Sequence, residues 1–114
     1  MATVESVRAG LEALVASMDD LDPDTRRKIP DRAVSAYFTD LDTAFAGRLQ
    51  SGSLVDVVEI DPDARKEAHL RLSLDSDTFL SIVEGRLDFA HAWSHGKVKV
   101  DARIRDIWEL RKFL

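Results

Sequence analysis

The spacing of apolar residues changes period along this chain, and that change constrains the fold more than any other sequence feature. Near the start, apolar residues recur at heptad positions, which predicts one apolar stripe on a helix from about Thr3 to Asp19. The stripe consists of Val4, Val7, Leu11, Leu14, Met18 and Leu21. The period then changes to that of strands and becomes helical again at Ser76. A chain that mixes the two periods in this order is predicted to be α+β.

The apolar stripe of this first helix allows two kinds of partner. Because it covers fewer than three heptads, we expect it to dock on the domain's own sheet, and a helix–helix seam in a homodimer is the alternative. On the outside of the helix, Arg8 lies three residues after Glu5 and four before Glu12. We expect Arg8 to pair with these neighbours, because residues at such spacings face each other.

A cluster of aspartates follows the first helix, in the segment Asp19-Asp20-Leu21-Asp22-Pro23-Asp24. It lacks the glycine and the glutamate that an EF-hand loop requires at its sixth and twelfth positions, so we predict no calcium site here. A solvated turn is the expected structure. We expect Asp24 or Thr25 to cap a short helical segment that ends before Pro30.

Three strands are predicted in the middle of the chain. Apolar and polar residues alternate over residues 34–38, which predicts the first strand, and the second is Thr43–Leu49. Gln50-Ser51-Gly52-Ser53 is a hairpin signal, and the β-branched run Leu54–Ile60 follows it as the third strand.

A fourth strand shows the clearest alternation in the chain. Pro62 interrupts the third run, since proline cannot donate a hydrogen bond to a ladder. Apolar residues then alternate with polar ones, which predicts a strand with one apolar face formed by Ala68, Leu70, Leu72 and Leu74. Short links between the four strands predict an antiparallel meander.

Two short helices are predicted after the fourth strand. Asp75 or Ser76 is expected to cap the first helix, and Gly85 is expected to end it. The second helix is expected over Leu87–Ser94 and ends at Gly96.

A fifth strand and a final helix complete the predicted elements. Val98, Val100 and Ala102 alternate with polar residues, which predicts the strand. Residues 103–114 have the apolar spacing of a helix.

Length and composition limit the class of protein. With 114 residues, 45% of them hydrophobic, we expect a single domain over residues 1–114. The absence of cysteine excludes disulfides, thiol nucleophiles and thiolate metal sites. A net charge of −5 argues against nucleic acid and anionic membranes as partners. Neither a targeting segment nor a membrane-spanning apolar run is visible, so we expect a soluble cytoplasmic protein without stable membrane insertion.

One segment carries a family resemblance. Residues 73–102, SLDSDTFLSIVEGRLDFAHAWSHGKVKVDA, contain a strand end, a capped apolar helix, Gly85, a short helix around Ala92-Trp93, Gly96 and a Lys-Val-Lys-Val strand. This pattern resembles the SCP2-like (sterol carrier protein 2) domain family, and the match covers about residues 68 to 114. Upstream, the segment DLDTAFAGRL at residues 40–49 is similar to short bacterial members.

The resemblance implies a five-stranded, mostly antiparallel sheet covered on one face by helices. It also implies an apolar cavity between the sheet and the C-terminal helices that accepts a sterol, a fatty acid or an acyl-CoA. No cofactor is implied. The alternative is a non-enzymatic interaction or oligomerisation module, in which the same side chains fill the core completely.

The expected lining of this cavity has two sources. These are the aromatic residues of the last third of the chain and the apolar faces of the predicted elements. The expected lining residues are Phe38, Phe45, Leu70, Leu72, Phe79, Leu80, Val83, Phe89, Trp93, Val98, Val100, Ile104, Ile107 and Trp108.

The histidines do not form a convincing metal site. His91 and His95 are four residues apart, as zinc ligands are in H-E-x-x-H, but the residues between them are Ala92-Trp93-Ser94 and supply no general base. We expect two exposed imidazoles near a helix end, and His69 on the polar side of its strand. No metal is therefore predicted.

Signals for catalysis are also absent from the sequence. There is no G-x-S-x-G nucleophile elbow and no glycine-rich phosphate loop after a strand, so we predict that the chain is not an enzyme. Lys97 and Lys99 alternate outward from the last strand. They either form a solvated face or contact the phosphate of an acyl-CoA or a lipid head group.

Overall fold

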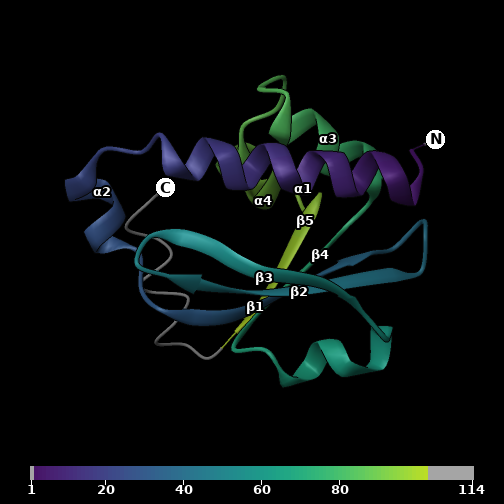
Figure 1. Cartoon of the computed structure of the whole chain (residues 1–114). Coiled ribbons are helices and arrows are strands. Elements are labelled where there is room, and N and C mark those ends of the chain that lie inside the picture. The colour runs from purple at the N-terminus through teal and green to yellow at the C-terminus, as the bar shows by residue number, and fades with distance from the viewer. Residues whose placement is uncertain (1, 103–114) are drawn as a thin grey trace.

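Five strands in the described part of the chain form one sheet, and helices cover one of its faces (Figure 1). The structure, a computed structural model, describes residues 2–102. The elements in chain order are α1 (Val4–Asp19), α2 (Pro23–Lys28), β1 (Arg32–Phe38), β2 (Thr43–Gln50), β3 (Ser53–Ile60), the 3-10 helix η1 (Pro62–Glu67), β4 (Leu70–Leu74), α3 (Ser76–Val83), α4 (Phe89–Ser94) and β5 (Val98–Ala102). The predicted α+β class and the mostly antiparallel sheet are confirmed. The helix predicted over residues 103–114 lies outside the described residues.

The order of the strands corrects the predicted meander. The sheet runs β3-β2-β1-β4-β5, so β4 pairs with β1 and not with β3. The β1–β4 pair is parallel, while the other three pairs are antiparallel. Parallel neighbours need a crossover connection, and residues 61–69 provide it through η1. Ser35 holds this crossover on the sheet, because its buried hydroxyl donates to the carbonyl of Arg65 at 2.9 Å.

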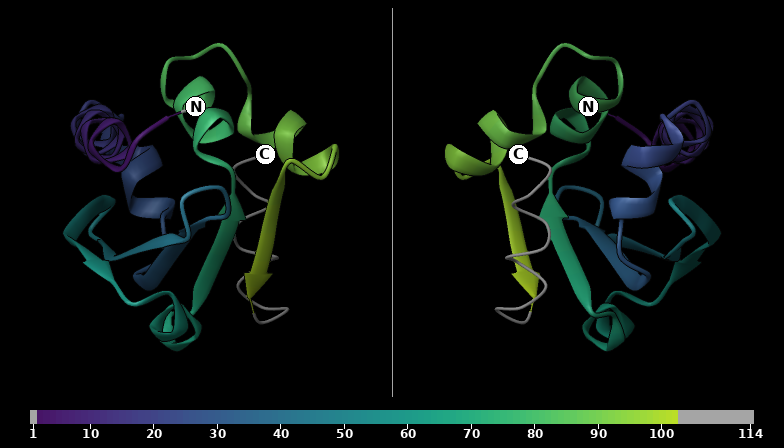
Figure 2. Two further views of the ribbon diagram at one scale, coloured as in Figure 1. Left: turned by 90° about the vertical axis from the view of Figure 1, so that its right-hand side faces the viewer. Right: turned by 90° about the vertical axis from the view of Figure 1, so that its left-hand side faces the viewer.

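The register of the paired strands places apolar side chains together on one face of the sheet. Ala36 of β1 lies beside Phe45 of β2 and Leu72 of β4, and Leu72 lies beside Val100 of β5. Figure 2 shows α1, α3 and α4 side by side over the same side of the sheet. The buried core between these layers consists of Val7, Leu11, Phe38, Phe45, Leu74, Phe79, Ala92 and Val98.

The first helix docks on the domain itself, as predicted from its apolar stripe. A capping box between Thr3 and Ser6 begins α1, and Val7 and Leu11 enter the core. Leu21 at the far end of the stripe is exposed. The packing of α1 on the sheet and on α3 confirms the intramolecular partner. A homodimer stays a prediction.

Three local boundaries differ from the sequence predictions. The cap residue of α2 is Asp22, not Asp24 or Thr25, because Pro23 occupies the first helical position, where its missing N–H costs nothing. Ala68 ends η1 and does not belong to β4. The helix α4 begins at Phe89 rather than at Leu87, since the Asp88 carboxylate accepts the His91 N–H at 3.1 Å and acts as its cap.

Helix ends at the predicted glycines are confirmed. Gly85 and Gly96 follow α3 and α4 with φ of 77°, a left-handed conformation that glycine adopts without steric cost.

A polar junction connects the β1–β2 turn with the start of α3. The carboxylate of Asp40 accepts hydrogen bonds from both the N–H and the hydroxyl of Ser76, whose side chain is fully buried. Burial alone would raise the pKa of Asp40, but the hydrogen bonds from Ser76 outweigh it and the pKa lies below its usual range. The ionised carboxylate is therefore the form that stabilises the junction.

We expect Asp40→Asn to lower the free energy of unfolding by about 1 kcal/mol at pH 7, because one charge-assisted acceptor is lost at an exposed site. The contribution of Asp40 is fully present above the pKa of an unfolded aspartate, about 3.9, and is lost as the pH falls through the lower folded value. Urea denaturation at pH 7 and at about pH 2.5 measures the difference between the two proteins. A gap that stays constant between these pH values would contradict the assignment.

A glycine inside α1 allows α1 and α3 to pack closely. A Cβ atom at Gly10 would lie 2.9 Å from Phe79 Cε2 and 3.0 Å from Leu80 Cδ2. Phe79 is itself fixed by edge-to-face packing on Phe38, with ring centroids 5.1 Å apart. The small residue therefore serves packing, although glycine weakens a helix.

We expect Gly10→Ala to destabilise the protein by about 1–2 kcal/mol, because overpacking against α3 outweighs the better helix propensity of alanine. The matched control is Ala9→Gly on the exposed side of α1, which should cost about 1 kcal/mol through propensity alone. Thermal unfolding of both variants measures these effects. A more stable Gly10→Ala variant would show that α1 and α3 are not in close contact.

Candidate functional site

A pocket of about 290 Å³ opens between α1 and the β2–β3 side of the sheet. One wall comes from α1, and Phe45 of β2 and Val57 of β3 form the floor. The α1 residues that line it are Arg8, Leu11, Glu12 and Val15. Leu11 and Phe45 are buried, so the deep end of the pocket is apolar.

A bulge in β3 shapes the floor of this pocket. The register between β2 and β3 shifts between Ala46 and Arg48, and Asp56 has a φ of 55° at that place. The extra residue brings Leu54 and Val57 to the same face. A Cβ atom at Gly47 would lie 3.1 Å from Leu54 Cδ1 and 3.2 Å from Val57 Cγ2, so both side chains reach over this glycine.

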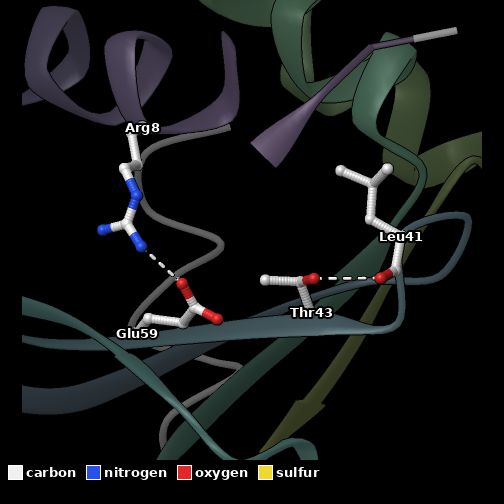
Figure 3. Close-up of polar contacts among 4 residues, drawn as sticks. All are labelled: Arg8, Leu41, Thr43 and Glu59. Atoms are coloured by element: carbon white, nitrogen blue, oxygen red, sulfur yellow. Dashed lines mark hydrogen bonds and ion pairs between the residues drawn. The ribbon is translucent and has the colours of Figure 1, made fainter. Parts of the chain in front are cut away.

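Charged side chains form the rim of the pocket. Arg8 of α1 forms an ion pair with Glu59 of β3, and Figure 3 shows the two side chains reaching toward each other from the helix and the strand. The guanidinium carbon of Arg8 lies 5.3 Å from the centroid of the Phe45 ring. Both members of the pair are about half exposed, with 52% and 46% of their side-chain surface accessible. An exposed pair contributes little stability, so another anion can compete for Arg8 at low cost.

This pairing corrects the sequence prediction for Arg8. We expected Arg8 to pair within its own helix, whereas the ion pair links α1 to β3.

Figure 3 also shows the Thr43 hydroxyl donating to the Leu41 carbonyl at 2.9 Å, which fixes the turn before β2. The β-sheet and α1 are thus connected by both apolar and charged contacts.

The predicted lining residues fall into three groups. Five are buried in the core or against it: Phe38, Phe45, Leu70, Phe79 and Val98. Six are partly exposed: Leu72, Leu80, Val83, Phe89, Trp93 and Val100. Three lie outside the described residues: Ile104, Ile107 and Trp108. Of the eleven that the structure describes, Phe45 alone lines the pocket under α1.

Two aromatic contacts show how the predicted residues are used in the described part. Phe38 packs edge-to-face on Phe45 and on Phe79, with ring centroids 6.1 Å and 5.1 Å away. On α4, Phe89 and Trp93 pack on each other with centroids 6.0 Å apart. The first cluster is solid core. The cavity expected between the sheet and the C-terminal helices stays a prediction.

Sequence reasoning missed five of the six described residues that line the pocket under α1. Leu11 and Val15 follow each other at helical spacing, but a stripe of this kind does not distinguish a residue in the core from one at a pocket wall. Val57 was not predicted because strict alternation puts it on the opposite face of β3 from Leu54, whereas the bulge at Asp56 brings both to the same face. Arg8 and Glu12 carried the ordinary signal of an exposed helical pair.

His91 of α4 and His95, which caps the end of that helix, are exposed, and their rings stack with centroids 4.0 Å apart. His95 Nδ1 lies 2.9 Å from the carbonyl of His91. His69 precedes β4 and does not belong to it. Its Nδ1 accepts the Ala33 N–H at 3.2 Å. Within residues 2–102, no group of three or more metal-ligating side chains lies close enough to hold an ion. None of the helices in this range combines the length and the hydropathy needed to cross a bilayer.

Comparison with solved structures identifies the architecture. Sterol carrier protein 2 from Aedes aegypti, solved in complex with palmitate, matches 99% of this chain over 96% of its own, with a TM-score of 0.63 and 21% identity. Palmitated SCP2L2 from the same organism matches 98% of this chain over 94% of its own, with a TM-score of 0.65 and 15% identity. The chain has the SCP2-like fold.

A segment of a longer protein matches this chain with higher sequence identity. The stereoselective inverting sec-alkylsulfatase Pisa1 from Pseudomonas sp. matches 84% of this chain with 26% identity and a TM-score of 0.57. The present chain covers 14% of the length of that enzyme. No protein-family profile and no curated protein sequence match the chain. A bacterial origin and a cytoplasmic location stay predictions for this SCP2-like chain.

Proposed function

We propose that this chain binds an apolar ligand with one polar end, such as a fatty acid, and does so without catalysing a reaction. The observation that carries the proposal is the pocket under α1, with its apolar floor and its charged rim. Its volume of about 290 Å³ is near the lower limit of about 300 Å³ for ligand sites in proteins. Two SCP2 proteins with the same fold bind palmitate, which supports this class of ligand.

The energetics favour a hydrocarbon chain in this position. Each methylene buried against Leu11, Val15 and Val57 would contribute about 0.8 kcal/mol. Arg8 would release Glu59 and pair with the carboxylate of the ligand instead. Breaking the exposed Arg8–Glu59 pair costs little free energy. Sterols and acyl-CoA also combine an apolar body with a polar end, and the same chemistry would admit them.

The proposal of a non-enzymatic role is supported by the groups around the pocket. Its described polar lining consists of Arg8 and Glu12, and Glu59 pairs with Arg8. Among the described lining residues there is no hydroxyl, thiol or imidazole that would serve as a nucleophile, and Glu12 is an exposed carboxylate.

A second candidate function is that of an interaction module with a filled core. It is favoured by the match to a short part of Pisa1, because a segment similar to this chain forms part of that much longer protein. Such a module would bind no lipid. Native mass spectrometry of the purified, untreated protein distinguishes the two functions, since a carrier retains bound lipid and a filled module does not.

A tryptophan at the pocket wall is expected to block binding. Val15→Trp should weaken palmitate binding at least about tenfold, or 1.4 kcal/mol, because the indole occupies the space of the chain. The matched control is Ala13→Trp, which adds the same side chain at an exposed position of α1 outside the pocket lining. Titration of delipidated protein with palmitate, followed by native mass spectrometry, measures both. Equal affinities of the two variants would place the ligand elsewhere.

Arg8 is expected to bind the polar end of the ligand. Arg8→Met keeps most of the apolar length of the side chain and should weaken palmitate binding by roughly three- to tenfold, consistent with loss of one exposed charge pair. Binding of hexadecanol, which has no charge, should change by less than about twofold. A uniform loss for both ligands would show that Arg8 only supports the fold.

A further inference from the structure

A second concave site lies on the other face of the sheet, away from α1, α3 and α4. Its volume is about 440 Å³, and it is bordered by β1, β4, η1 and the start of β5. Figure 1 shows η1 (residues 62–67, in teal) below the sheet and the α-helices α1, α3 and α4 above it. The sheet therefore separates this groove from the pocket under α1, and the inference below does not rest on the proposed function.

Strand register aligns polar side chains along the floor of the groove. Tyr37 of β1 lies beside Ser73 of β4, and Ser73 lies beside Lys99 of β5. Lys97 lies just before β5 and also lines the groove. Both lysine side chains are exposed and reach the groove from the edge of the sheet.

A third cation is held in place from the opposite side of the groove. The guanidinium carbon of Arg65, on η1, lies 4.3 Å from the centroid of the Tyr37 ring. Arg65 Nη1 donates to the carbonyl of Pro62 at 2.6 Å, and the Arg65 carbonyl accepts the hydroxyl of Ser35 at 2.9 Å. Because backbone and side chain are both fixed, little conformational entropy is lost when an anion binds Arg65.

Within the described residues, no ion pair neutralises the cations of this groove. Neither Lys97 nor Lys99 forms an ion pair in the part of the chain that the structure describes. Asp75 is the one carboxylate in the described lining, and its Oδ1 already accepts the Thr78 N–H at 2.6 Å. Three cations thus face one engaged carboxylate, although the whole chain has a net charge of −5.

We propose that this groove binds a phosphate-class anion carried by a small molecule. A doubly charged group can contact Lys97, Lys99 and Arg65 at once, whereas a single carboxylate would leave part of this charge unmatched. The hydroxyl of Ser73 supplies a neutral donor between the cations. The volume leaves room for a phosphate attached to a larger group or for a diphosphate.

Inorganic pyrophosphate is the first probe, titrated into the ¹⁵N-labelled chain and followed by amide chemical shifts. Saturable shifts are expected at residues 65 and 97–99. The double variant Lys97→Gln/Lys99→Gln should weaken binding at least about tenfold. The control Lys28→Gln, an exposed lysine on α2 that does not line the groove, should change it by less than about twofold.

Two competition experiments distinguish a soluble phosphate compound from a lipid head group. Competition by glycerol 3-phosphate supports a soluble phosphate compound, and competition by dihexanoyl phosphatidic acid alone supports a lipid head group. The Val15→Trp variant should retain pyrophosphate binding, so failure of the lipid pocket is distinguishable from failure of this groove. Shifts that do not saturate, or an equal loss in Lys28→Gln, would overturn the proposal and indicate non-specific screening. Circular dichroism verifies that each variant is folded.

Discussion

The packing of Phe38 between Phe45 and Phe79 is the contact on which the rest of the structure depends. It joins β1, β2 and α3 at the centre of the core, where Phe38 is completely buried. The position of Phe79 in turn requires a residue without a side chain at Gly10, and this brings α1 close to α3. With one side of α1 held in this way, its other side stands over β2 and β3 and leaves the pocket that Arg8 and Glu59 border.

Much of this architecture follows from periodicity in the sequence. Heptad spacing predicted α1, alternation predicted β4, and Gly85 and Gly96 marked the helix ends at left-handed positions. The parallel pairing of β1 with β4 was not predictable in the same way, because it depends on η1 crossing the sheet. The hydrogen bond from Ser35 to the Arg65 carbonyl, which fixes that crossover, joins residues thirty positions apart and leaves no local pattern.

The candidate site was harder to predict than the fold for a related reason. Its floor depends on a single extra residue in β3, which turns Val57 toward α1, and its rim depends on an ion pair between distant elements. The family resemblance came from residues in the second half of the chain, whereas this pocket is formed by the first half. An SCP2-like fold of this kind therefore offers two chemically different surfaces, one apolar and one basic, separated by the thickness of one sheet.

The central claim is that the apolar ligand lies between α1 and the β2–β3 side of the sheet. Isotope-filtered nuclear Overhauser measurements on methyl-labelled protein with unlabelled palmitate test it most directly. We expect contacts from the palmitate chain to the methyl groups of Leu11, Val15 and Val57. Contacts confined to Leu72 of β4, Val83 of α3 and Val100 of β5 would show that the ligand does not lie in the pocket under α1.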